Sequence, residues 1–121
     1  MCNIISMNIG GRTFQAADIK QNYIENIIKQ AGSCDKIRRI VLFGSVTEKR
    51  CSKESDIDVA VFGDEAESKV LKSKSYKDFV RGLFSYDFSQ DYDILYFRNG
   101  TVHDTSIMED INKGAVVYER N

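Results

Sequence analysis

The sequence predicts one α/β (α+β) domain with a mixed sheet of about four strands and helices packed mainly on one face. Three observations favour this fold class. Short runs of branched apolar residues recur along the chain, amphipathic helical patterns lie between them, and glycines or polar clusters separate the two kinds of segment. Because helices on one side leave the other face of the sheet uncovered, we expect that second face to receive a substrate.

Composition excludes several classes of protein. With 121 residues and 42% hydrophobic composition, the chain has enough apolar side chains for one modest core. The net charge of −1 argues against direct binding to nucleic acid, which needs a concentrated basic face. The three cysteines show no C-x-x-C spacing, so neither a zinc cluster nor a disulfide framework is expected. No apolar run is long enough to cross a membrane and no signal-peptide pattern opens the chain, so the expected location is the cytoplasm.

The first residues are distinguished from the rest of the chain. Residues 1–16 are interpreted as an N-terminal extension without an assigned role, and residues 17–121 as a single domain. Apolar residues ahead of Gly10-Gly11 are consistent with a short hairpin or with a loosely docked extension. The glycine pair predicts a turn, because no strand-loop-helix context supports a phosphate loop. From Asp18 to Ala31 the apolar residues fall on one face of a predicted helix.

The segment from Ile40 to Phe62 carries the motifs on which the functional prediction depends. Its apolar residues up to Phe43 predict a strand that ends at Gly44-Ser45. Gly44 has no side chain to keep a phosphate from the backbone. Ser45 is suited to open a short helix whose free N–H groups and hydroxyl face an anion. This end of the strand is therefore a candidate phosphate site.

The second strand of this segment carries paired carboxylates. Asp56 and Asp58 are two residues apart, so on a strand both point to one face. Two carboxylates about 4 Å apart repel each other by roughly 4 kcal/mol at an effective dielectric near 20, and a cation between them turns that repulsion into binding. Oxygen ligands favour magnesium or manganese, and magnesium normally shares its coordination shell with substrate phosphates. The pair therefore predicts a divalent-metal site that serves a nucleoside triphosphate.

The link between the two strands holds three basic residues, Lys49, Arg50 and Lys53. One of them could neutralise a leaving pyrophosphate, or all three are simply solvated, and the sequence leaves these alternatives open. Cys51 in the same link is expected to be a bystander, because no histidine lies near it in the sequence to activate a thiolate.

The next segment predicts a second helix and a third strand. Asp64 and Glu67 are expected to cap the helix at its start. Its apolar residues are spaced as one buried face: Tyr76, Phe79, Val80, Leu83 and Phe84. Residues 92–97 alternate as a strand, which places Asp93 as a third carboxylate and leaves Asp91 as the competing candidate.

The C-terminal part predicts one more helix and one more strand. Ser106 and Glu109 form a capping pattern, Gly114 is expected to end the helix, and residues 115–118 are expected to form a short final strand. His103 is the only histidine, and it is expected to be an exposed loop residue because no nucleophile accompanies it in a recognisable motif.

Taken together, these motifs resemble the signature of the DNA polymerase beta-like nucleotidyltransferase superfamily. The signature comprises Gly44-Ser45, ten intervening residues, Asp56-Ile57-Asp58 followed by Val-Ala-Val, and a third carboxylate on a later strand. The short chain is most similar to the minimal nucleotidyltransferases, over roughly residues 17–120. The resemblance implies the nucleotidyltransferase fold. It also implies that Asp56, Asp58 and Asp93 are catalytic and bind one or two Mg²⁺ ions, and that Gly44 and Ser45 bind the nucleotide.

The resemblance further implies Mg-dependent transfer of a nucleoside monophosphate, AMP from ATP by default, to a hydroxyl acceptor. Minimal nucleotidyltransferases are typically encoded beside a small helical HEPN-domain protein, a ribonuclease-type toxin, and act as its antitoxin by adenylylating a tyrosine on it. Two alternatives remain open. The protein could neutralise such a partner by contact alone, or it could modify small-molecule hydroxyls such as antibiotics in a pocket supplied by a homo-oligomer interface.

Overall fold

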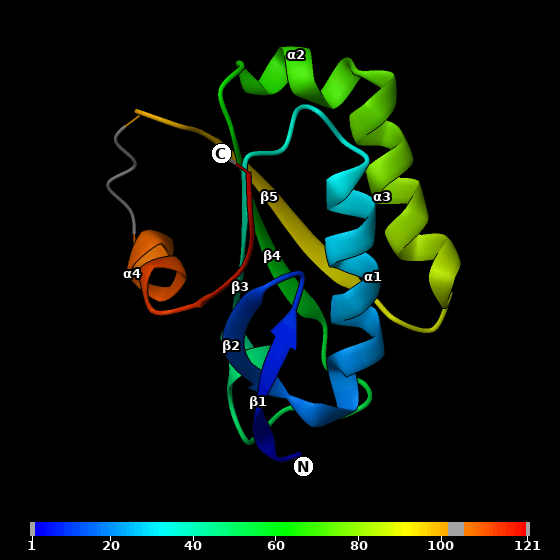
Figure 1. Cartoon of the computed structure of the whole chain (residues 1–121), viewed down its shortest axis with the longest axis vertical. Coiled ribbons are helices and arrows are strands. Elements are labelled where there is room, and N and C mark those ends of the chain that lie inside the picture. The colour runs from blue at the N-terminus through cyan, green and yellow to red at the C-terminus, as the bar shows by residue number, and fades with distance from the viewer. Residues whose placement is uncertain (1, 102–105, 121) are drawn as a thin grey trace.

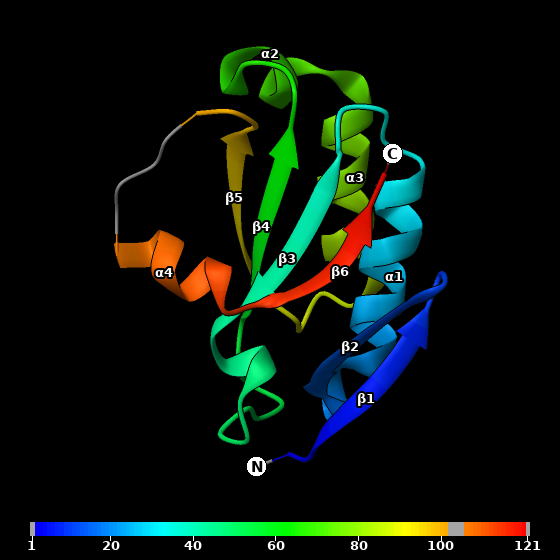
Figure 2. The ribbon, with the colours of Figure 1, turned by 60° about the vertical axis from the view of Figure 1, so that its left-hand side comes forward.

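A four-stranded mixed sheet forms the centre of the computed structural model, which describes residues 2–101 and 106–120 (Figure 1). The strand order is β5-β4-β3-β6 (Figure 2). Its strands are β3 (Arg39–Phe43), β4 (Ile57–Gly63), β5 (Tyr92–Arg98) and β6 (Ala115–Glu119). The helices are α1 (Gln21–Gly32), α2 (Glu67–Lys72), α3 (Lys74–Tyr86) and α4 (Ser106–Asn112), with short 3-10 helices η1 (Asp18–Lys20) and η2 (Gly44–Thr47). The predicted mixed sheet of about four strands is confirmed.

The strand directions bring one end of each of three strands to the same end of the sheet. β3 pairs antiparallel with β4 and with β6, whereas β4 pairs parallel with β5. A parallel pair needs a crossover connection, and α2 and α3 supply it. The C-terminal end of β3 therefore lies beside the N-terminal ends of β4 and β5. These are the three places where the sequence puts its Gly-Ser and carboxylate motifs.

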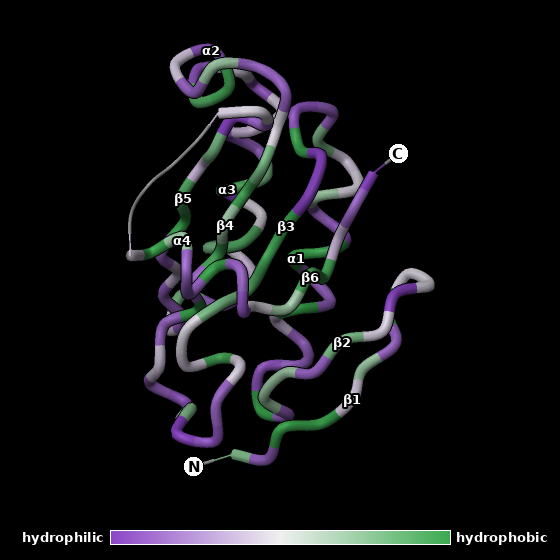
Figure 3. The backbone as a smooth tube through the Cα atoms, turned by 90° about the vertical axis from the view of Figure 1, so that its left-hand side faces the viewer, coloured by the Kyte–Doolittle hydropathy of each residue, from purple (hydrophilic) through white to green (hydrophobic). Residues whose placement is uncertain are grey.

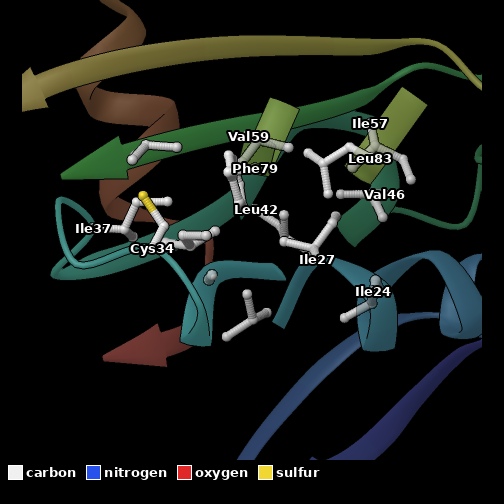
Figure 4. Close-up of a cluster of buried hydrophobic side chains, with 14 of the residues drawn as sticks. Ile24, Ile27, Cys34, Ile37, Leu42, Val46, Ile57, Val59, Phe79 and Leu83 are labelled. Atoms are coloured by element: carbon white, nitrogen blue, oxygen red, sulfur yellow. The ribbon is translucent and has the colours of Figure 1, made fainter. Parts of the chain in front are cut away.

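The main core fills the space between the sheet and the helices α1 and α3. Alternate residues of β4, namely Ile57, Val59 and Val61, have no exposed surface and belong to this core. Ile24 and Ile27 of α1 and Phe79 and Leu83 of α3 pack from the other side (Figure 4). Burying one such side chain stabilises a fold by roughly 1.5–3 kcal/mol. Hydropathy follows this arrangement, since the sheet strands are largely hydrophobic and the link from β3 to β4 is largely hydrophilic (Figure 3).

The sequence led us to expect that the opposite face of the sheet is uncovered. In the structure that face is partly covered. α4 lies on that face, on the other side of the sheet from α1 and α3 (Figure 2). Ile111 of α4 is buried against a second hydrophobic cluster with four sheet residues: Val41, Phe43, Ala60 and Phe62. Residues of this face alternate with those of the main core, so Asp58 and Asp93 share the face with α4, and Phe43 of the second cluster lies opposite Asp58.

Residues ahead of the main domain form a hairpin of β1 (Ile4–Ile9) and β2 (Arg12–Ala17). Its two-residue turn is Gly10-Gly11, with φ of 61° and 79°, values that favour glycine. The side chains of Met7, Phe14 and Ala16 belong to the main core, so this stretch is packed and not loosely attached. Arg12 donates from Nε to the carbonyl of Val116, at 3.1 Å, which joins the hairpin to β6.

The segment after β4 differs from the single capped helix that the sequence predicts. Asp64 does not cap it, because its carboxylate accepts from Arg38 at 2.6 Å and from Asn99 at 3.1 Å, and α2 begins after Ala66 without a side-chain cap. The helix is also broken at Ser73, whose hydroxyl accepts from the N–H of Tyr76 at 3.3 Å and so caps α3. The apolar stripe itself is confirmed, since its members at 76, 79 and 83 are buried.

Two further predictions concern the C-terminal region. α4 begins at Ser106, so Ser106 lies inside the helix and the capping position falls outside the described residues, as does His103. The final strand is confirmed as β6. Within residues 2–101 and 106–120, no helix combines the length and the apolar character needed to cross a membrane.

Candidate active site

The turn at the end of β3 is the first component of the site. Phe43 has an extended backbone, and Gly44 then takes φ of +75°, a left-handed conformation that favours glycine. η2 follows at once and is closed by two hydrogen bonds: the N–H of Glu48 donates to the carbonyl of Ser45 at 2.9 Å, and the Thr47 hydroxyl donates to the carbonyl of Gly44 at 2.8 Å. The short helix predicted at Gly44-Ser45 is thus present, and its role in holding a phosphate stays a prediction.

Asp58 and Asp93 form the second component. In the β3–β4 ladder Asp58 lies opposite Phe43, directly before the Gly44 turn, and in the parallel β4–β5 ladder it lies opposite Asp93. Both carboxylates therefore stand on one face of neighbouring strands, Asp58 half-buried and Asp93 exposed. Burial raises the pKa of Asp58 above its ordinary value, and the charges of Asp93 and Asp56 raise it further.

Asp56 is placed somewhat differently from the prediction. β4 begins at Ile57, so Asp56 directly precedes the strand and its side chain is exposed. Its charge still acts on Asp58. Among the described residues, however, no group of three or more His, Cys, Asp or Glu side chains is arranged to hold a metal ion. The three aspartates therefore share one electrostatic environment without forming a ready-made three-ligand site.

None of these three aspartates is neutralised by a basic side chain in the part of the chain that the structure describes. The salt bridges there involve other carboxylates, and no side-chain hydrogen bond is formed by Asp56, Asp58 or Asp93. Two facing carboxylates on adjacent strands, about 5 Å apart, repel by roughly 3 kcal/mol at an effective dielectric of 20. An all-oxygen donor set with uncompensated negative charge has the chemistry that a hard divalent cation requires. The donor set thus fits magnesium.

Comparison with known families identifies the family of the chain. The model described as "Polymerase beta, Nucleotidyltransferase" matches residues 23–121, which is most of the chain. The chain belongs to this nucleotidyltransferase family. A search among curated proteins found no significant match. The superfamily resemblance seen in the sequence is thereby confirmed, and the protein is a transferase of the nucleotidyltransferase class.

Register also distinguishes the two candidates for the third carboxylate of the nucleotidyltransferase. Asp91 lies ahead of β5, and what it contributes is its backbone carbonyl, which accepts from the N–H of Ile57 at 3.1 Å and from the side-chain amide of Gln90 at 2.7 Å. Asp93 is the residue that lies level with Asp58 and whose charge raises the pKa of that group. The geometry favours Asp93.

The basic residues of the link are not equivalent in the folded nucleotidyltransferase. Arg50 donates to the carboxylate of Glu48, at 2.9 Å and 3.2 Å, and its charge lowers the pKa of Asp58 against the larger effect of burial. Lys49 and Lys53 have exposed side chains. Arg50 is thus the link cation within electrostatic reach of the carboxylates, and any contact with a phosphate stays a prediction. Cys51 is buried, and burial raises the pKa of its thiol, which agrees with a bystander.

Sequence reasoning missed two buried polar residues beside the site. Lys20 is 1% exposed and Gln90 is 3% exposed, and the Lys20 ammonium donates to Gln90 Oε1 at 2.6 Å. Neither position carries a signal in the sequence. A lysine at the start of an amphipathic helix is normally solvated, and a glutamine in a polar loop normally faces water.

Proposed function

We propose that this protein is a Mg-dependent nucleotidyltransferase that transfers a nucleoside monophosphate, AMP from ATP in the first instance, to a hydroxyl acceptor. One observation carries the proposal. Asp58 and Asp93 lie side by side in register next to the Gly44 turn, and the described residues supply no basic side chain that pairs with either. The repulsion between two such carboxylates lowers the stability of the fold unless a cation lies between them. Their oxygen atoms suit a hard divalent cation that also binds phosphates.

The chemistry is an in-line displacement at the α-phosphorus. Gly44 and Ser45 hold the β- and γ-phosphates, so the α-phosphorus faces the acceptor. The acceptor oxygen forms a bond to the α-phosphorus, the bond from the α-phosphorus to the bridging oxygen breaks, and pyrophosphate leaves with that electron pair. Asp93 accepts the proton of the acceptor hydroxyl. One or two magnesium ions held by Asp56, Asp58 and Asp93 would supply charge neutralisation for the attacking and leaving oxygens.

For the acceptor, we propose a tyrosine of a HEPN-type toxin, which makes the protein an antitoxin of a toxin–antitoxin pair. The support is the similarity to minimal nucleotidyltransferases together with the openness of the site, because Asp93 is exposed and accessible to a macromolecular hydroxyl. The three cysteines are free thiols, which agrees with a reducing cytoplasm as the place of action.

A second candidate function is an antitoxin that binds its partner without modifying it. The observation in its favour is the lack, among the described residues, of a ready-made group of three metal-ligating side chains. A protein of this kind would retain the fold and the partner surface while its nucleotide site had lost its use.

The deciding experiment supplies purified protein and magnesium with a HEPN-type partner or a cell lysate, and with ATP labelled at either the α- or the γ-phosphate. Label arriving on a macromolecule only from the α position supports nucleotidyl transfer, and the size of the labelled species identifies the acceptor. Label from the γ position would mean phosphoryl transfer and overturn the proposal. No transfer from either position, with tight partner binding, would favour the contact-only antitoxin.

The experiment has a pair of matched variants. Asp58→Asn removes one carboxylate without changing side-chain shape and should abolish transfer. Asp35→Asn makes the same chemical change in the loop between α1 and β3, where Asp35 accepts from the Ser75 hydroxyl at 3.0 Å, a bond that asparagine can also accept. It should leave transfer unchanged.

A further inference from the structure

A buried lysine lies at the junction of the chain segments that carry the catalytic carboxylates. Lys20 ends η1, just before α1, and is 1% exposed. Its ammonium group donates to the carbonyl of Lys53 at 3.1 Å, to the carbonyl of Ser55 at 2.9 Å and to Gln90 Oε1 at 2.6 Å. All three ammonium protons thus have an acceptor, and in the described residues none of these acceptors is a carboxylate.

Gln90 extends this contact to the next strand. Its side-chain amide donates to the carbonyl of Ser55 at 3.0 Å and to the carbonyl of Asp91 at 2.7 Å. The Asp91 carbonyl in turn accepts from the N–H of Ile57, the first residue of β4, at 3.1 Å. Lys20 and Gln90 therefore connect the loop ahead of β4 with the chain just ahead of β5.

We propose that Lys20 is a positioning residue that, through Gln90, holds the Asp56 loop and the start of β5 in the relative placement that the site requires. Asp56 follows Ser55 directly, and Asp93 is three residues beyond Gln90. Fixing the carbonyl of Ser55 and the backbone of Asp91 limits how far these two carboxylates can move relative to Asp58. The effect of Lys20 on catalysis rests on the proposed function. Its effect on the relative placement of the two segments does not.

The ammonium group at this position is accounted for by the acceptors that it contacts and by the charges of Glu54 and Asp56, which act on its pKa against the larger effect of burial. A methionine would bury a similar apolar stem without the cost of desolvating an ammonium group, a cost that shows as burial lowering the pKa of Lys20. What methionine cannot do is donate three hydrogen bonds to inward-facing carbonyl groups. Lys20 also precedes the region matched by the family model, residues 23–121.

The test compares Lys20→Met with Lys29→Met, which removes the same charge from an exposed position on α1. Two measurements are made on protein that is shown to be folded by circular dichroism. The first is amide hydrogen exchange in peptides that cover residues 52–58 and 88–93, and the second is Mn²⁺ binding followed by electron paramagnetic resonance. We expect Lys20→Met to exchange faster in both peptides. Because Lys20→Met also removes a positive charge that acts on Asp56, Mn²⁺ binding is compared in Gln90→Met, which keeps that charge, and we expect it to be roughly 10-fold weaker there. Lys29→Met should match the wild type in both.

Folded Lys20→Met protein with wild-type exchange in both peptides would overturn the inference. If the wild type itself binds no Mn²⁺, the proposed metal-dependent function fails, and hydrogen exchange alone then decides the positioning role. If Lys20→Met does not fold, Gln90→Met takes its place, because it keeps the lysine and removes only the amide that joins the two segments. Unchanged exchange at 52–58 and 88–93 in that variant would likewise overturn the inference.

Discussion

The carboxylate of Asp58 occupies the space that a side chain at Gly44 would fill. A β-carbon at position 44 would overlap with Asp58 Oδ2, and the backbone φ of +75° at this position is itself one that L-residues rarely adopt. Gly44 opens η2 directly after β3 whereas Asp58 lies on β4, and the two residues belong to different halves of the sequence signature. Their contact explains in physical terms why the glycine and the carboxylate occur together, because the turn can approach β4 this closely only without a side chain.

Gly44→Ala should therefore damage both stability and activity. The left-handed conformation alone costs an alanine about 1–2 kcal/mol, and the overlap must also displace the Asp58 carboxylate from the site. We expect the free energy of unfolding in urea to fall by at least that amount and nucleotidyl transfer to be lost.

Gly11→Ala is the matched control for this substitution. Gly11 has φ of +79°, but a β-carbon there would meet no atom within 4 Å. It should lose a similar amount of stability through backbone strain and keep its transfer activity. Full transfer activity in Gly44→Ala would contradict the proposed relation between the turn and Asp58.

Asp93→Asn and Asp91→Asn separate the two candidates for the third carboxylate. Asp93 lies level with Asp58 in the parallel ladder, and its loss would remove both the proposed metal ligand and the proposed acceptor of the hydroxyl proton. Asp91 contributes a backbone carbonyl that asparagine retains. We expect transfer of α-labelled AMP to fall by at least 100-fold in Asp93→Asn, a loss of about 2.7 kcal/mol of transition-state stabilisation, and to persist in Asp91→Asn. The reverse order would move the third ligand to Asp91.

Several elements of the fold follow from local patterns in the sequence. Alternation of apolar residues locates the sheet strands, because β4 buries every second side chain in the main core. The glycine pair Gly10-Gly11 predicts the turn, because its two positive φ angles are ones that only glycine adopts readily. In the site, the spacing of Gly44, Asp58 and Asp93 is informative because each lies at a strand end, where backbone pairing fixes its position.

Other features depend on contacts that no local pattern records. The apolar stripe of the second helix begins at Tyr76 and gives no indication of the break at Ser73, which depends on a hydroxyl that caps α3. The sequence predicts the helix that begins near Ser106, but not the side of the sheet against which Ile111 packs. Lys20 and Gln90 are 70 residues apart, and only the folded chain brings a buried ammonium group to that amide.

Magnesium should stabilise the folded protein without any nucleotide. A ligand that binds only the folded state at 100 times its dissociation constant stabilises that state by about 2.7 kcal/mol, and the uncompensated carboxylates near Asp58 are the groups that would bind it. We expect the melting temperature to rise on addition of MgCl₂ and to return on addition of EDTA. Asp58→Asn should abolish the rise, and an equal rise in that variant would place the metal elsewhere.

Asp58→Asn should also make the metal-free protein more stable at neutral pH. Burial, followed by the charges of Asp93 and Asp56, raises the pKa of Asp58 in the folded state above its ordinary value. A carboxyl group with a raised folded-state pKa contributes stability below its ordinary pKa and loses that contribution as the pH rises through the raised value. At about pH 7 the ionised group is therefore a net cost that neutral asparagine avoids, and we expect a gain in unfolding free energy of at most about 1 kcal/mol, because solvent reaches this half-buried group and screens its charge.

The dependence of that gain on pH tests its origin. Urea unfolding measured from about pH 7 down to about pH 4 should show the advantage of Asp58→Asn shrinking as Asp58 of the wild type becomes protonated. The exposed substitution Asp35→Asn should stay within about 0.5 kcal/mol of the wild type throughout. A variant at position 58 that is less stable than the wild type at neutral pH would show that the Asp58 carboxylate is compensated in the fold. The uncompensated charge to which we attribute metal binding would then not exist.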